Sequence, residues 1–135
     1  MQPDFNMKNF LGEIASYLAT SLGGNTGELI FVEQLPEKEH PSKAVAIIQQ
    51  AGLPGQTDQP VKTINTQILC RDSSIPDALD LAQTTFNALN MKSNILATYT
   101  GRCEPTSVFG IRYNDANNRV VYPLNFRWRM VYMRG

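Results

Sequence analysis

The stretch that decides the fold is RVVYPLNFRWRMVYM, residues 119–133. Every second residue of its central part is large and apolar, namely Tyr122, Leu124, Phe126, Trp128, Met130 and Tyr132. A period of two is typical of a β-strand that is buried on one face only. The sequence therefore predicts a long strand with an apolar core face and an opposite face that carries Arg127 and Arg129. Trp128 and Tyr132 are expected in the core, and the alternative is that they anchor a subunit interface.

Earlier segments of the chain also predict strands. Residues 61–71 (VKTINTQILCR) alternate in the same way, with Arg71 on the polar face and Leu69 as the apolar exception there. The residues expected on the core face of this strand are Ile64, Thr66, Ile68 and Cys70. Further runs typical of strands occur at residues 29–32, 43–49 and 108–113. Residues 95–100 fit either an extended connection or a short strand.

A first amphipathic helix is predicted at residues 5–22, where apolar residues recur every three or four positions. Asn6 is the expected N-cap, and Phe5 and Phe10 have the spacing of a hydrophobic staple. Gly23 follows the last apolar residue and is typical of a helix end. The expected buried stripe is Phe10, Leu11, Ile14, Leu18 and Leu22.

A second amphipathic helix is predicted from Ser74 to about residue 90. Ser74 and Asp77 have the spacing of a capping box, and Pro76 lies in the first turn, where a missing N–H costs little. The expected buried stripe is Ile75, Leu79, Ala82, Phe86 and Leu89.

The elements follow one another in the order α-β-β-β-α-β-β, which predicts an α+β fold. Consecutive strands with short connections favour a mostly antiparallel sheet, and the two helices are expected to cover one of its faces. A chain of 135 residues is the usual size of one domain. We therefore expect a single domain over residues 1–135, large enough to fold without a disulfide or a structural metal.

Composition limits the kinds of function. Twelve basic and twelve acidic residues cancel, so no net charge steers the chain toward nucleic acid or an anionic membrane. Cys70 and Cys103 have no metal-binding spacing, and reduced, partly buried thiols are favoured over a disulfide. Neither a signal peptide nor an apolar run of membrane-spanning length is visible, so we expect no membrane partner.

The sequence contains no catalytic constellation. Its one histidine is His40, which lies in the charged, proline-bounded loop at residues 34–42. None of the common nucleophile, metal-protease or phosphate-binding motifs is present. We therefore expect a protein that is not an enzyme and has no metal site and no cofactor.

Three parts of the chain are candidates for contact with partners. Two are loops, at residues 34–42 and 51–60, and the third is the arginine-bearing side of the last strand. The candidate residues are Glu37, Lys38, Glu39, His40, Gln56, Asp58, Arg119, Arg127 and Arg129. The first loop fits either a solvated charged loop or a subunit contact. The arginines fit a solvated face, inter-subunit ion pairs, a nucleic-acid contact or the rim of a DNA channel.

Four short motifs succeed one another along the chain. They are GLPG at 52–55, TQILCR at 66–71, DANNR at 115–119 and YPLNF at 122–126. In this order they resemble the minor capsid and tail terminator family of long-tailed bacteriophages and prophages, over residues 29–132. Where that family has Gly in the turn, this chain has Asn117-Asn118. Asn also tolerates the left-handed conformation, so the turn should be retained.

The resemblance implies a ring-forming protomer, commonly in a hexamer. Such a ring caps the tail tube, stops its polymerisation and meets the head connector or stopper protein, while DNA only passes through as cargo. It implies a place in the virion, at the head-proximal end of the tail, after assembly in the host cytoplasm. An edge strand and charged loops would supply the ring contacts. The alternatives are a head-completion or neck protein, and a small nucleic-acid-binding module that uses the arginines of the last strand.

Overall fold

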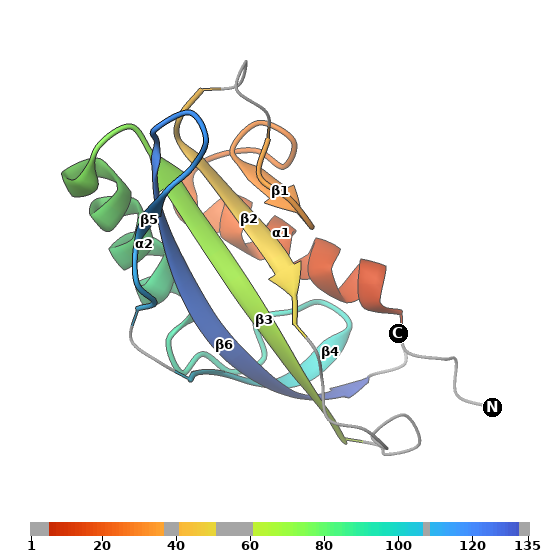
Figure 1. Ribbon diagram of the computed structural model, residues 1–135. Coiled ribbons are helices and arrows are strands. Elements are labelled where there is room, and N and C mark those ends of the chain that lie inside the picture. Colours follow the sequence, from red (N-terminus) through yellow and green to blue (C-terminus); the bar gives the residue numbers. More distant parts are fainter. Residues whose placement is uncertain (1–5, 37–40, 51–60, 107–108, 133–135) are drawn as a thin grey trace.

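The computed structural model describes residues 6–36, 41–50, 61–106 and 109–132. Two helices and six strands alternate in these residues (Figure 1). The elements are α1 (Met7–Leu22), β1 (Ile30–Val32), β2 (Ala44–Gln49), β3 (Val61–Asp72), α2 (Ile75–Leu89), β4 (Tyr99–Pro105), β5 (Tyr113–Asn114) and β6 (Val120–Tyr132). The α+β class is confirmed, with one strand more than the predicted order contained.

The strands form one mixed sheet in the order β1-β2-β3-β6-β4, and β5 pairs with the start of β6, whereas β4 pairs with its end. Its centre is the long antiparallel pair β3–β6, which runs from Val61 opposite Val131 to Asp72 opposite Val120. β1 and β2 are parallel, so the prediction that consecutive strands pair antiparallel is wrong here. The connection between them spans residues 33–43, which is longer than a hairpin turn and lets the chain return before it pairs.

The first helix follows its sequence signals. The side chain of Asn6 accepts a hydrogen bond from the Asn9 N–H at 3.1 Å, and Gly23 ends the helix at a φ of 72°. The predicted stripe is buried except for Leu22, which is half-buried. Phe5, the outer half of the predicted staple, lies outside the described residues.

The second helix begins as predicted but buries a different stripe. The Ser74 hydroxyl accepts a hydrogen bond from the Asp77 N–H, and Pro76 lies in the first turn. Ile75 and Leu79 are 43% and 39% exposed, so their predicted burial is wrong. The buried residues are Ala78, Leu81, Ala82, Thr85 and Leu89. The small side chains of Ala78 and Ala82 on this face allow the helix backbone to approach the sheet closely.

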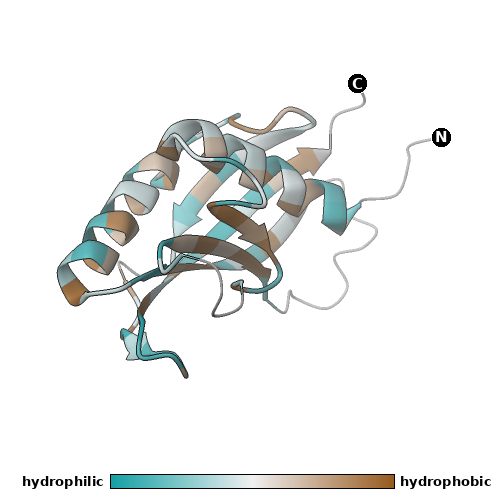
Figure 2. Ribbon diagram, turned by 90° about the horizontal axis from the view of Figure 1, so that it is seen from above, coloured by the Kyte–Doolittle hydropathy of each residue, from teal (hydrophilic) through white to brown (hydrophobic). Residues whose placement is uncertain are grey.

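The core lies between the two helices and one face of the sheet, as predicted (Figure 2). The Phe10 ring meets Tyr99 and Trp128 edge to face, at centroid distances of 5.3 and 5.6 Å. The Trp128 indole N–H donates to the buried Thr66 hydroxyl at 2.8 Å. Trp128 is therefore a core residue, and the side chain of Tyr132 lies outside the described residues.

Both cysteines are buried and free, as the sequence favoured. Burial raises the pKa of the Cys70 thiol to about 12, despite a hydrogen bond with Thr85 that lowers it. Burial, and then the charge of Glu104, also raise the pKa of Cys103. A thiol rather than a thiolate is expected at both positions, so neither is a ready nucleophile.

The segment before the last turn differs from its prediction. Of residues 108–113, only Tyr113 joins a strand, and Val108 lies outside the described residues. The Gly110 N–H donates to the Pro123 carbonyl at 2.7 Å, but Pro123 has no N–H with which to complete a reciprocal pair. Regular pairing therefore fails at this point. Residues 95–98 form a connection, and the strand begins at Tyr99.

Candidate assembly surfaces

The face of the sheet opposite the helices carries a basic patch at one end of β6. In the paired strands, Glu104 lies opposite Arg127, and Arg102 lies opposite Arg129. We call these four residues the arginine face. Residues paired across antiparallel strands share one face of the sheet, so the predicted pair Arg127 and Arg129 is brought together with two residues of β4.

One carboxylate serves both arginines of the last strand. Glu104 lies 3.5 Å from the Arg129 Nε and 4.0 Å from an Arg127 Nη. The side chain of Arg127 is 39% exposed and that of Arg129 is 59% exposed, so each ion pair contributes well under about 1 kcal/mol to stability. The Nε of Arg127 is buried and has no hydrogen-bond partner among the described residues. Three arginines and one carboxylate therefore leave the arginine face with an excess of positive charge that the ion pairs among the described residues do not neutralise.

Arg119 lies at the other end of β6 and has a different environment. It is buried, and its Nε lies 3.3 Å from a carboxylate oxygen of Asp115. Asp115 also accepts hydrogen bonds from the N–H groups of Asn117 and Arg119, and Asn118 adopts the left-handed conformation at a φ of 61°. The turn is therefore retained with Asn in place of Gly, as predicted.

The pKa of Asp115 reflects these opposing effects. Burial raises the pKa, but the two N–H donors and the charges of Arg119 and Arg71 together lower it by more. The net pKa of Asp115 is therefore below its ordinary value. Asp115 is accordingly a fixed anion in the turn.

Arg71 lies on the face of the strand that the sequence predicted, but its burial there was not expected. It lies on the polar face of β3 but is only 1% exposed. Its guanidinium donates to the carbonyls of Pro36, Pro41 and Ser42 at 2.8, 3.2 and 2.9 Å, and it lies 4.0 Å from Asp115. Burial, followed by the charge of Arg119, lowers its pKa against the opposite effects of Asp115 and Asp72.

The apolar Leu69 on the otherwise polar face of β3 was the feature of the sequence that could have indicated the burial of Arg71. Leu69 packs with Ala46 and Val121 in a second, smaller apolar cluster on the same face, so this end of the face is covered. Arg71 thereby fixes Pro36, Pro41 and Ser42, which belong to the charged loop at residues 34–42. The predicted contact residues Glu37, Lys38, Glu39 and His40 lie outside the described residues, as do Gln56 and Asp58.

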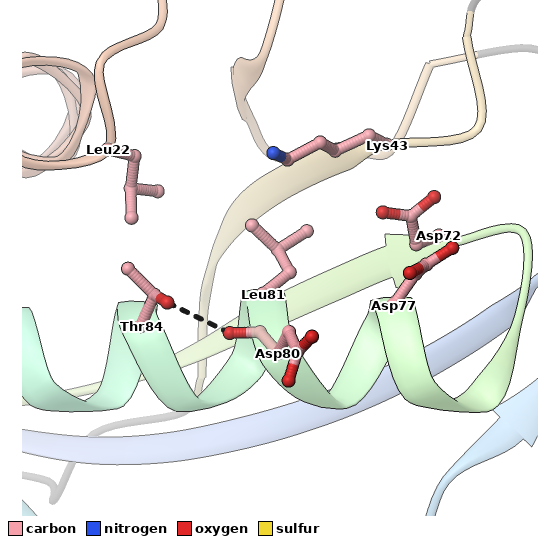
Figure 3. Close-up of a pocket in the computed structure, with 7 residues that line it drawn as sticks. All are labelled: Leu22, Lys43, Asp72, Asp77, Asp80, Leu81 and Thr84. Carbon is pink, nitrogen blue, oxygen red and sulfur yellow. Dashed lines mark hydrogen bonds between the residues drawn. The ribbon is translucent and has the colours of Figure 1, made fainter.

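A pocket of about 260 Å³ lies between the end of α1, the start of β2, the end of β3 and the first turns of α2 (Figure 3). We call it the acidic pocket; it is lined by Leu22, Lys43, Asp72, Asp77, Asp80, Leu81 and Thr84. In the part of the chain that the structure describes, no cluster of acidic, histidine or cysteine residues is arranged to hold a metal ion. Sequence reasoning missed this pocket because its residues come from four separate elements.

The outer edge of β4 is covered in its middle by the chain itself. The Asn94 N–H donates to the Gly101 carbonyl at 2.7 Å, and the Cys103 N–H donates to the Lys92 carbonyl at 2.9 Å. Addition of a partner strand at these positions would have to break these bonds. Contacts on this side of the sheet are therefore expected to use side chains rather than the edge strand that a ring contact was expected to use.

The family assignment rests on a comparison of sequence. A sequence model of the bacteriophage tail terminator proteins matches residues 17–132, from within α1 to the end of β6. The chain belongs to this family. The predicted resemblance is thereby confirmed, and it extends further toward the N-terminus than residues 29–132. As a tail terminator family member, the protein has a structural role in a phage-type tail.

Two solved structures are similar to this tail terminator protein. One is in the virion of a native gene transfer agent particle, with 12% identity, 90% of this chain and 93% of that chain covered, and a TM-score of 0.67. That likeness supports the fold. A structure from Akkermansia muciniphila, described as lacking its transmembrane region, has 12% identity, covers 95% and 84% of the two chains and has a TM-score of 0.41, too low to carry an argument. A search of curated protein sequences found no significant match.

Two of the motifs that carry the resemblance, DANNR at 115–119 and YPLNF at 122–126, contribute to the fold of this protein. Tyr122 and Phe126 point into the core, and Asp115 holds Arg119 and Arg71. These residues stabilise the fold. Within the described residues, neither helix is long and apolar enough to cross a membrane.

Proposed function

We propose that this protein forms a closed ring, commonly a hexamer, that caps the tail tube and stops its polymerisation. The observation that carries the proposal is the family match, which includes every strand of the sheet. In this proposal the ring joins the tube to the head connector or stopper protein at the head-proximal end of the tail. DNA passes through it only as cargo, and the ring is assembled in the host cytoplasm.

The shape of the protomer supports this role. A terminator needs one surface that matches the tube and another that does not propagate it. Two helices cover one face of the sheet (Figures 1 and 2), whereas the opposite face carries the arginine face. A single chain with unlike surfaces can make the heterologous contacts that close a ring.

A structural rather than catalytic role is part of the proposal. Both thiols are buried with a raised pKa, and the one histidine belongs to a charged loop. The proposal therefore includes no reaction, no cofactor and no metal.

Tail assembly with and without the protein tests the proposal. With the protein present, electron microscopy should show tubes of uniform length that carry a ring at one end, and its omission should give tubes of variable, extended length. Uniform tubes in its absence would contradict the proposal. A label found on portal ends instead of tube ends would favour a head-completion or neck protein.

The arginine face is the observation that favours a nucleic-acid-binding module as a second candidate. Such a module predicts DNA or RNA binding that weakens with salt and is lost when Arg127 and Arg129 are both changed to Ala. The Glu104 carboxylate beside both arginines counts against this candidate. Absence of binding in a gel-shift assay at low salt would remove it.

A further inference from the structure

We propose that the arginine face of one copy of this chain docks into the acidic pocket of a second copy, forming a head-to-tail contact. The inference rests on the ring proposed above and identifies the two surfaces that would close it. Its basis is the charge, shape and placement of these surfaces within one chain.

The arginine face has an internal repulsion. Arg102 and Arg129 occupy directly opposite positions on β4 and β6, on the same face of the sheet. Like charges in such a cross-strand pair destabilise the sheet. Glu104 is the only carboxylate among the four residues and already lies beside Arg127 and Arg129. Carboxylates from outside the chain would relieve the repulsion.

The acidic pocket has the opposite imbalance, with three aspartates and one lysine. In Figure 3 the ammonium of Lys43 extends toward Leu22, whereas the carboxylates of Asp72 and Asp77 lie together at the other end. None of the aspartates belongs to an ion pair formed within the described residues. The pocket has an excess of two negative charges, which equals the positive excess of the arginine face.

The lining of the pocket also suits an arginine side chain. Leu81 forms an apolar part of the wall between the Asp72 and Asp77 carboxylates and Leu22, which lies at the opposite end of the pocket (Figure 3). A guanidinium pairs with carboxylates through several directed hydrogen bonds, and its aliphatic stem is stabilised against apolar surface. The compact ammonium of a lysine would pair with several carboxylates in a less directed way than a guanidinium does.

The two surfaces are too far apart to meet within one molecule. Asp72 is at one end of β3 on the helix side, whereas Asn65, seven residues away, pairs with Arg127 on the open side. At the rise of an extended strand, that separation is about 23 Å. Complementary surfaces at different places on one chain favour a head-to-tail contact, which closes into a ring if the rotation per subunit allows it.

Charge reversal on the full chain provides the test. The first variant carries Arg127→Glu and Arg129→Glu, and the second carries Asp77→Lys and Asp80→Lys. Each alone places like charges across the contact, and association should weaken by about tenfold or more. The oligomer is measured by sedimentation velocity at low salt and by counting rings on tail tubes in electron micrographs.

Two rescues distinguish this contact from general damage. A chain with all four changes has both surfaces reversed and should assemble again. An equimolar mixture of the two double variants should also assemble, because alternating copies then pair opposite charges. Circular dichroism melting confirms that each variant is folded.

The matched controls change exposed charges elsewhere. They are Arg112→Glu with Lys92→Glu, and Glu28→Lys with Glu33→Lys, and neither pair should alter assembly. If wild-type rings form and tolerate both reversals, or if neither rescue restores assembly, the docking inference is wrong while the ring proposal stands. If the wild-type chain forms no ring on tubes, both proposals are wrong.

Discussion

Arginine and carboxylate side chains meet at both ends of the β3–β6 pair, on the same face of the sheet, but they are buried at one end and partly exposed at the other. At one end, Arg71 and Arg119 are buried around Asp115. At the other end, Arg127 and Arg129 share Glu104 while remaining partly exposed. The same chemistry therefore holds the fold together at one end and leaves charge available for a partner at the other.

The largest effect is expected at Arg71. Replacement by Ala removes the donors to three carbonyls and leaves Asp115 without one of its partners. Loss of one member of a buried charged network should lower the free energy of unfolding by about 3–5 kcal/mol, measured by urea denaturation. Arg71→Lys should recover only part of this loss, because one ammonium cannot reach all three carbonyls in the same geometry. A loss below about 1 kcal/mol would show that the buried end is not held by this residue.

Asp115→Asn should have the next largest effect, roughly 2 kcal/mol, since it leaves Arg71 and Arg119 buried without a negative charge between them. The folded-state pKa of Asp115 lies below its ordinary value of about 3.9, so its carboxylate contributes stability above that value. This contribution is lost as the pH falls through the lower, folded-state pKa. Melting curves from pH 7 to pH 2 should therefore fall less steeply for Asp115→Asn than for the wild type. Parallel curves would contradict the assignment.

Glu104→Gln tests the exposed end and should have the smallest effect on stability, under about 1 kcal/mol. Both of its ion pairs are partly solvated, so added salt should reduce the difference from the wild type further. Denaturation at low and high salt measures this, with Glu28→Gln as the matched surface control. A loss as large as that of Asp115→Asn would remove the distinction between the two ends.

Local pattern predicted the elements well and their long-range arrangement less well. The period of two in β3 and β6 and the cap at Asn6 are properties of neighbouring residues, and the structure confirms them. The parallel pairing of β1 with β2 depends on where the chain returns, which local pattern does not specify. The place of β6 between β3 and β4 is likewise a matter of long-range pairing.

The candidate site was predicted in part, for a related reason. An alternating strand assigns each residue to a face but does not tell which part of that face another segment covers. Arg127 and Arg71 therefore looked equivalent, although one is partly exposed and the other is buried. The acidic pocket had no sequence signature, because Lys43 and Asp80 come together only in the folded chain.

The central position of β6 also has a consequence for how the protein is made. β6 is the last of the described elements to leave the ribosome, yet it pairs with β3 on one side and with β4 on the other. Its pairs with β3 join residues as far apart as Val61 and Val131, and contacts at such separation form slowly. Until β6 emerges, β3 lacks one neighbour and β4 lacks its principal one. Until that point the nascent chain presents unpaired strand edges, and the sheet closes only after β6 has been synthesised.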